Sequence, residues 1–100
     1  MRIIAVRNLK AFWKKYPDSK KSLLALQSIV KSSRWKNANE VKLAFPFVSV
    51  LKNNRIVFNI KGNDYRLIVA FNFKAGISFV CFIGTHSEYD KVNAETIWKY

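Results

Sequence analysis

The sequence is poor in several residue types, and each scarcity limits what the protein can be. It has one cysteine, Cys81, and one histidine, His86, among its 100 residues. A lone cysteine excludes an intramolecular disulfide and fits a reducing cytoplasm, and one histidine with one distant cysteine supplies no zinc-type ligand set. No apolar run approaches the ~18 residues that a membrane-spanning helix requires. We therefore expect a soluble, cytoplasmic protein that spans no membrane and uses neither a metal nor a cofactor.

Acidic residues are scarce as well. Six Asp and Glu stand against eighteen Lys and Arg, which gives a formal net charge of +12. Most of the excess lies in residues 1–36, which hold ten basic residues and a single acid, Asp18. Such a charge opposes compaction by self-repulsion and favours a polyanionic or acidic partner. Nucleic acid is the first expected partner class, an acidic protein the second and an anionic membrane surface the third.

What the sequence does contain is 50% apolar residues, enough for one modest core in a single domain over residues 1–100. A β-branched run predicts a strand over residues 1–6, after which Asn8 can cap a helix over residues 9–16. Pro17 ends this helix, and Asp18 or Ser19 caps a second one. The apolar positions of the second helix have helical spacing: Leu23, Leu24, Leu26, Ile29 and Val30. So short a connection predicts an antiparallel helical hairpin.

Residues 35–47 have no lasting period and predict an irregular connector, after which the chain turns to strands. A two-residue loop at Gly62-Asn63 and a three-residue loop at residues 74–76 put three strands in antiparallel register. The predicted fold is α+β: an N-terminal strand, a helical hairpin and a three-stranded antiparallel block that completes a small curved sheet (β-α-α-β-β-β), with a short C-terminal helix. Residues 93–100 form an amphipathic tail that returns Ile97 and Trp98 to the body.

In this register the two faces of the sheet differ in character. The face predicted to lie under the helices is apolar: Tyr65, Leu67, Val69, Phe71, Phe79, Cys81 and Ile83. The opposite face carries Arg55, Asn59 and Arg66, and Arg66 lies opposite Gly84, two residues before His86. Arg66 and His86 are therefore predicted to share one edge of the sheet.

Two motifs on this edge, Gly-Asn-Asp-Tyr-Arg at residues 62–66 and Gly-Thr-His-Ser-Glu-Tyr-Asp at residues 84–90, together resemble the HigB toxins of bacterial type II toxin–antitoxin systems. These toxins belong to the wider RelE/ParE group. The resemblance spans nearly the whole chain, including Tyr16-Pro17 and residues 44–46. The segment with His86 and Tyr89 departs from the RelE pattern, which relies on Lys, Arg and Tyr near the C-terminus, so RelE roles are not copied onto it.

The resemblance implies an mRNA endoribonuclease, or mRNA interferase, that cuts messages on the ribosome and contacts ribosomal RNA. It also implies a HigA-type antitoxin with a helix-turn-helix, operator DNA bound only through the toxin–antitoxin complex, and no membrane partner. Two other functions stay open: a non-enzymatic ParE-like toxin that inhibits a topoisomerase, and a basic RNA-binding module. An enzyme requires His86 and Arg66 to flank one phosphate, whereas a binding protein leaves them scattered.

RNA is cleaved without a metal when the 2′-hydroxyl is deprotonated, the phosphorane charge is held by cations and the departing 5′-oxygen is protonated. A histidine side chain titrates near pH ~6.5, so His86 is a candidate acid or base, with a surface histidine in a turn as the alternative. Arg66 is the candidate phosphate clamp, and its alternative is an ion pair with Glu88 or Asp90. Tyr89 either stacks on a base or donates a proton, or its ring only caps the sheet edge.

Supporting and binding roles complete the predicted site. Asp90 is predicted to orient His86 or Arg66, and Asn59 lies beside Arg66. The predicted RNA-binding residues are basic side chains of the helices and the sheet: Lys10, Lys14, Lys20, Lys21, Arg55 and Lys61. Any single one of the helical lysines is more simply a solvated surface residue, whereas together, with so few acids nearby, they favour phosphate contacts. Cys81 is predicted to be a core residue.

Overall fold

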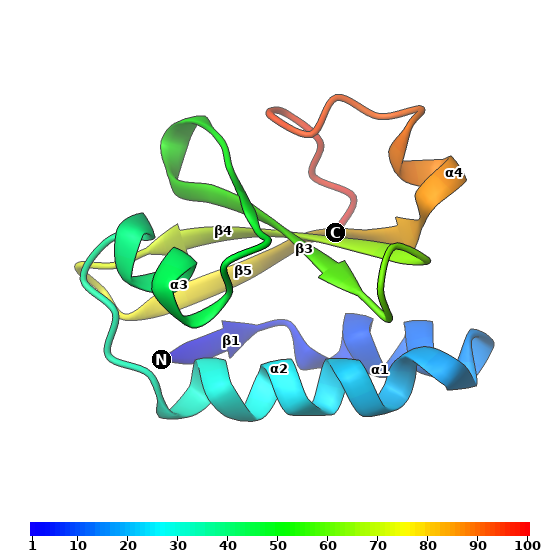
Figure 1. Ribbon diagram of the computed structural model, residues 1–100, viewed down its shortest axis with the longest axis horizontal. Coiled ribbons are helices and arrows are strands. Elements are labelled where there is room, and N and C mark those ends of the chain that lie inside the picture. Colours follow the sequence, from blue (N-terminus) through cyan, green and yellow to red (C-terminus); the bar gives the residue numbers. More distant parts are fainter.

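The computed structural model describes residues 1–100 as one five-stranded sheet with a helical hairpin on one face and the C-terminal segment on the other (Figure 1). The strand order is β1-β5-β4-β3-β2. β1 (Arg2–Ile4) pairs in parallel with β5 (Ile77–Thr85). β4 (Tyr65–Asn72), β3 (Arg55–Ile60) and the two-residue β2 (Ser49–Val50) continue the sheet in antiparallel pairs. The predicted α+β architecture is confirmed.

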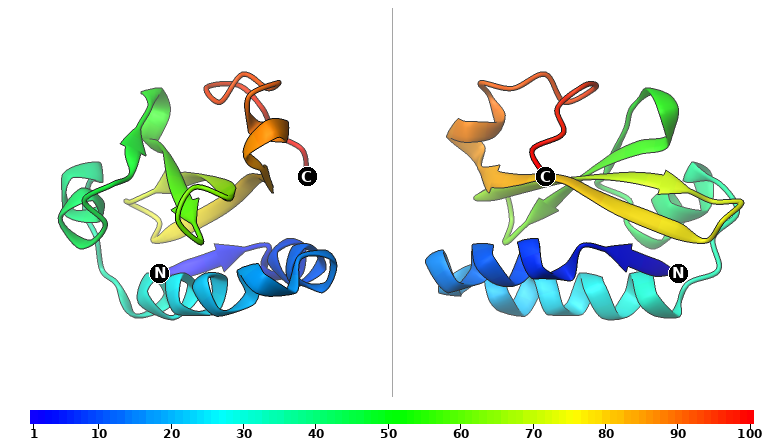
Figure 2. Two further views of the ribbon diagram at one scale, coloured as in Figure 1. Left: turned by 45° about the vertical axis from the view of Figure 1, so that its right-hand side comes forward. Right: turned by 180° about the vertical axis from the view of Figure 1, so that it is seen from behind.

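The helical hairpin is present, although it begins earlier than expected. α1 (Val6–Lys15) and α2 (Lys20–Ser32) lie side by side under the sheet and are joined by a 3-10 turn over Pro17–Ser19 (Figures 1 and 2). Asn8 does not cap α1, because the helix already starts at Val6 and the Asn8 amide donates to the carbonyl of Ala5 at 3.1 Å. The earlier start of α1 does not change the predicted hairpin or its basic residues.

The connector predicted to be irregular contains a helix, α3 (Ala38–Ala44). The Asn37 side chain caps it by accepting a hydrogen bond from the Glu40 amide at 3.0 Å. The helix ends ahead of Pro46, which cannot continue it. Seven residues give only two turns, so no apolar period was visible in the sequence. None of the helices has the length and apolar character needed to cross a bilayer.

The core has two parts, one on each face of the sheet. The larger cluster lies between the sheet and the helical hairpin and includes Leu9, Leu23 and Phe58. The smaller cluster consists of Val57, Ile68, Cys81 and Phe82 on the other face, where the C-terminal segment covers it. Figure 2 shows this segment and the hairpin on opposite sides of the sheet. The tail predicted to return to the body does so, with Ile97 against the smaller cluster.

The predicted register of β3 with β4 holds throughout, whereas that of β4 with β5 holds only at the end where the two motifs lie. Ile60 pairs with Tyr65, and Arg66 lies opposite both Asn59 and Gly84, as expected. Further along, a β-bulge between Ile68 and Val69 shifts the pairing of β4 with β5. An extra residue in one strand moves the side chains beyond it to the opposite face of the sheet.

Because of the bulge, two residues lie on the opposite face of the sheet from the predicted one. Cys81 belongs to the smaller cluster under the tail, and Phe79 packs against Trp98, so neither faces the helices as predicted. Val80 takes their place in the larger cluster. On α2, Leu23, Leu26 and Val30 are buried as predicted, whereas Leu24 and Ile29 are exposed.

Candidate functional site

The edge where β4 begins and β5 ends holds the two sequence motifs. β5 runs directly into a single helical turn, α4 (His86–Tyr89). A capping box fixes this turn: the Glu88 amide donates to Thr85 Oγ1 at 3.2 Å, and the Thr85 amide donates to Glu88 Oε1 at 2.8 Å. The hydrogen bond from the Thr85 amide lowers the pKa of the Glu88 carboxyl below its ordinary value. Glu88 is thus a structural residue that orients α4.

His86 is held at its main chain and at one ring nitrogen. Its amide donates to the carbonyl of Asp64, on the turn between β3 and β4, at 3.0 Å. Its Nδ1 lies 3.1 Å from Asp90 Oδ2, the contact predicted from the sequence. The side chain is half-exposed, and Nε2 has no protein partner. A carboxylate on Nδ1 selects the tautomer that leaves Nε2 able to accept a proton.

Arg66 has no carboxylate partner, so the alternative of an ion pair with Glu88 or Asp90 is wrong. Its Nη1 donates to the carbonyl of Asn63 at 3.2 Å, and its Cζ lies 5.7 Å from the centre of the Tyr89 ring. The cation therefore rests on an aromatic face and keeps most of its donors unused. Such a guanidinium is free to grip a phosphate.

Tyr89 links the arginine to the body of the protein. Its ring packs against the smaller core cluster while its other side supports Arg66. The predicted structural role, a ring at the sheet edge, is thus present. Because Tyr89 and His86 belong to the same helical turn, the imidazole and the guanidinium lie at one edge of the sheet, as the register predicted. Asn59 is exposed on the neighbouring strand, opposite Arg66.

Arg55 is not part of a surface that binds RNA, and its prediction as an RNA-binding residue is wrong. Only 5% of the residue is exposed. Its Nε donates to the carbonyl of Ala94 at 3.0 Å, a second guanidinium nitrogen donates to the carbonyl of Ile97, and the group lies against the Trp98 ring. The C-terminal tail uses the donors that a phosphate would need.

Comparison with known proteins identifies the family. Residues 19–92 match the family described as HigB toxin, RelE-like toxic component of a toxin-antitoxin system. The chain belongs to the HigB toxin family. It is 30% identical over 92 residues to the mRNA interferase toxin HigB of Escherichia coli K12, covering 90% of this chain and 88% of that protein. It is 32% identical over 94 residues to an mRNA interferase HigB of Escherichia coli O6:H1, covering 92% and 91%.

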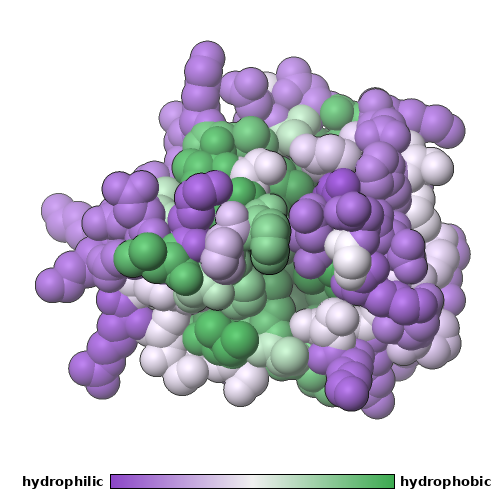
Figure 3. Space-filling model, viewed as in Figure 1, coloured by the Kyte–Doolittle hydropathy of each residue, from purple (hydrophilic) through white to green (hydrophobic).

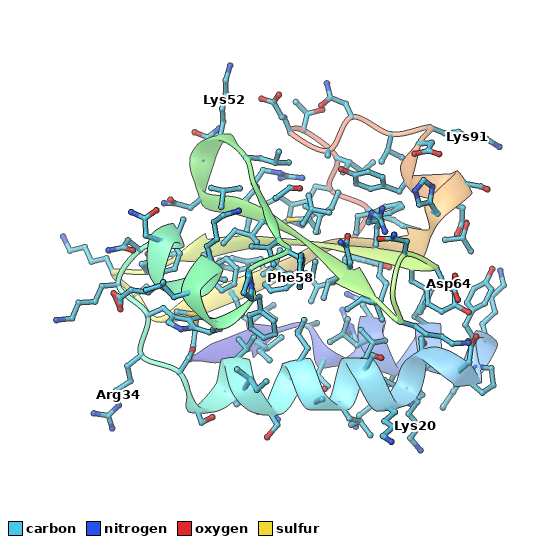
Figure 4. All side chains as sticks on the ribbon, in the orientation of Figure 1. Lys20, Arg34, Lys52, Phe58, Asp64 and Lys91 are labelled. Carbon is cyan, nitrogen blue, oxygen red and sulfur yellow. The ribbon has the colours of Figure 1, made fainter.

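In this HigB family toxin the basic side chains of the helical hairpin belong to the side of the sheet opposite α4 (Figure 1). Lys10 and Lys14 on α1 and Lys20 and Lys21 on α2 are exposed, as their predicted role requires. Lys20 projects from α2 away from the sheet, on the side opposite α4 (Figure 4). These exposed lysines are thus able to contact a large polyanion from the hairpin side. Their role in binding RNA stays a prediction.

Lys61, also predicted to bind RNA, is partly neutralised. Its Nζ lies 2.6 Å from Asp18 Oδ2 and 3.9 Å from Asp64 Oδ2. The other oxygen of Asp18 accepts a hydrogen bond from the Tyr65 hydroxyl at 2.5 Å. The Lys61 ammonium and the Tyr65 hydroxyl lower the pKa of Asp18, and the same contacts raise the pKa of Lys61 and raise that of Tyr65 to about 12.

Sequence reasoning missed this role of Asp18, which was considered only as a helix cap. The acid joins the hairpin to the turn over residues 61–64, and the carbonyls of that turn hold Arg66 and His86. The one available signal was that Asp18 is the sole acid among the first 36 residues. No local pattern revealed its partners, because they lie 43 and 47 residues away.

Proposed function

We propose that this HigB family toxin is an mRNA interferase, a ribosome-dependent endoribonuclease that stops translation by cutting messages without a metal. The observation that carries the proposal is the edge where His86 is held at Nδ1 by Asp90 while Arg66 rests on Tyr89 of the same helical turn. The named activity of the relatives supports the reaction class. A HigA-type helix-turn-helix antitoxin would be the partner, with operator DNA bound only through the complex.

The residues suit cleavage by the RNA's own 2′-oxygen. Attack of this oxygen on the adjacent phosphorus, with loss of its proton, breaks the bond to the 5′-oxygen, which leaves as a hydroxyl after gaining a proton. His86 is the proposed general acid or base, and its Nε2, which has no protein partner, is the atom that takes or gives the proton. Arg66 offers donors to the non-bridging oxygens, whose charge grows in the transition state. Tyr89 supports the arginine and offers an aromatic edge to a base.

The test is growth arrest combined with mapping of the 5′ ends of cellular mRNA. Wild-type chain should arrest growth and create new 5′ ends within coding regions. His86→Ala and Arg66→Ala should each remove both effects while the purified variants keep the wild-type circular dichroism spectrum. Loss of a general acid or base costs about 10²–10⁴-fold in rate, enough to relieve arrest.

Matched controls exist for both positions. Ser87→Ala changes an exposed residue of the same helical turn that makes no side-chain hydrogen bond. Arg34→Ala removes an arginine that projects into solvent at the far end of α2 (Figure 4). Both controls should arrest growth like the wild type. Equal toxicity of the two site variants, or growth arrest without any new 5′ ends, would refute the proposal and favour a non-enzymatic toxin.

A further inference from the structure

A large apolar groove lies between α2, the connector after α3 and β3, and one of its ends reaches the turn beside Arg66. Its volume is about 770 Å³. One wall is α2, with Ala25 and Ile29, and the other is the connector from Phe45 to Val48. The floor is the second half of β3, and the turn over residues 61–63 closes one end. Figure 3 shows apolar surface at the centre of this face with hydrophilic residues on both sides.

The groove leaves large apolar side chains in water. Phe47 is 86% exposed on one rim and Ile29 is 45% exposed on the other. Neither is needed for the core, which is complete beneath them at Leu26 and Phe58. Contiguous exposed apolar surface of this kind marks a protein-binding site, since water favours its burial. Apolar walls do not attract a phosphate backbone, so RNA is the poorer occupant.

The floor of the groove is an unpaired strand edge. β2 pairs with β3 only at Ile56 and Val57, and the chain diverges from β3 beyond that point. The Leu51 amide donates to the carbonyl of Arg55 at 2.8 Å on this side, so alternation along the strand turns the main-chain groups of Asn59 toward the same edge. An N–H and a C=O without a strand partner invite an added strand.

The two positive charges at the groove differ in their partners: Asp18 and Asp64 already face the Lys61 ammonium, whereas Lys42 has no acidic partner. Lys61 is the only charged residue of its lining, and no acid lines it. Lys42 adds a second positive charge at the rim, where its Nζ donates to the carbonyl of Val48 at 3.2 Å. In a chain of net charge +12, an incoming segment with acidic side chains is the complementary occupant.

We propose that this groove is the docking surface for an extended, acidic and apolar segment of the antitoxin, which adds a strand to β3 at Phe58–Ile60. The inference rests on the family assignment, because a toxic component of a toxin–antitoxin system has an antitoxin. The segment's apolar side chains fill the space between Phe47 and Ile29, and an acid lies near Lys42, whose charge no acid of this chain neutralises. Three strand residues span only ~10 Å, so the groove holds one segment of a wider interface.

Docking in the groove also reaches the edge of the sheet that carries Arg66 and His86. The turn that closes the groove includes Asn63, whose carbonyl holds the Arg66 guanidinium. The same turn is joined to the hairpin by Asp18 through Lys61. A strand that binds along β3 therefore ends next to the group proposed to grip the phosphate. An antitoxin segment that occupies the groove therefore also neutralises the toxin.

Two matched pairs of variants test the proposal. Phe47→Glu and Ile29→Glu place a charge in the groove. Leu43→Glu and Leu24→Glu make the same change at side chains that are 82% and 44% exposed on α3 and α2 but lie outside the groove. All four positions are exposed, so the variants should fold, which circular dichroism checks. The probe is the antitoxin encoded beside the toxin gene, purified alone and titrated against each variant.

We expect Phe47→Glu and Ile29→Glu to bind the antitoxin more than about tenfold more weakly, with both controls within about twofold of wild type. Amide exchange at Asn59 should slow when the antitoxin binds. Groove and control variants bound alike, or Asn59 exchange left unchanged, would overturn the proposal. Groove variants that lose ribosome association but keep antitoxin affinity would assign the groove to RNA instead, and variants that only abolish self-association would assign it to a second copy.

Growth assays separate this inference from the proposed function. Groove variants expressed alone should still arrest growth, and co-expressed antitoxin should no longer rescue it. A wild-type chain that fails to arrest growth would contradict the proposed mRNA interferase activity. The binding titration would still test whether the antitoxin docks in the groove. Full rescue of both groove variants by the antitoxin would refute the docking surface and leave the nuclease untouched.

Discussion

Arg55 is expected to fasten the C-terminal tail to the sheet, and replacing it tests the structural role that the fold gives it. Arg55→Met keeps the length and the packing against Trp98 but removes the donors to the carbonyls of Ala94 and Ile97. A hydrogen bond from a charged group contributes about 1.5–3 kcal/mol net, so two contribute about 3–6 kcal/mol. The freed carbonyls can turn to water as the tail loosens, which reduces the expected loss to about 2–4 kcal/mol.

Urea unfolding measures this loss, with Lys52→Met as the control. Lys52 carries the same charge but projects into solvent from the loop before β3, so its replacement should cost less than about 0.5 kcal/mol (Figure 4). Amide exchange at Lys99, which donates to the carbonyl of Cys81 at 2.8 Å, should accelerate in Arg55→Met because the tail opens. A loss below about 1 kcal/mol together with unchanged exchange at Lys99 would refute the reasoning.

Three further predictions follow from other contacts. Asp18→Asn should destabilise the protein at pH 7 and progressively less as pH falls below ~3.9, because the lowered pKa of Asp18 gives stability above its unfolded value that is lost as pH falls through the folded value; equal urea midpoints for wild type and variant at pH 7 would contradict this. Phe58→Ala should cost about 3–5 kcal/mol in urea unfolding, since Phe58 is fully buried against Phe45 and Phe71, and a loss under 1 kcal/mol would contradict the core described above. Lys20→Glu with Lys21→Glu should weaken co-sedimentation with ribosomes at low salt without changing the melting temperature, and unchanged co-sedimentation would remove these lysines from the binding surface.

The part of the site that could be predicted from sequence is the part fixed by one tight turn. Gly62-Asn63 set the register of β3 with β4, and the spacing from Arg66 to Gly84 then put His86 at the same edge. These deductions need only strand alternation over a few residues. The predicted pairing of β4 with β5 fails beyond Ile68, because amino-acid composition gives no sign of a bulge. The bulge places Val80, instead of Cys81, on the face under the helices.

Arg55 and Asp18 mark the limit of the same reasoning. Alternation correctly assigned Arg55 to the face opposite the helices, but only the path of the tail, 39 residues further on, decided that the guanidinium is buried. Asp18 likewise found its partners across the fold, where no pattern in residues 1–36 could point to them. Local periodicity predicts elements and faces, whereas contacts between distant segments decide which polar groups remain free.

The most direct test of the account is the single-turnover cleavage rate of a defined message on purified ribosomes. His86→Ala and Arg66→Ala, at saturating enzyme, are expected to slow cleavage by at least about 100-fold, while Ser87→Ala keeps the wild-type rate. Unaltered rates in both site variants would contradict the central claim that this imidazole and this guanidinium carry the reaction.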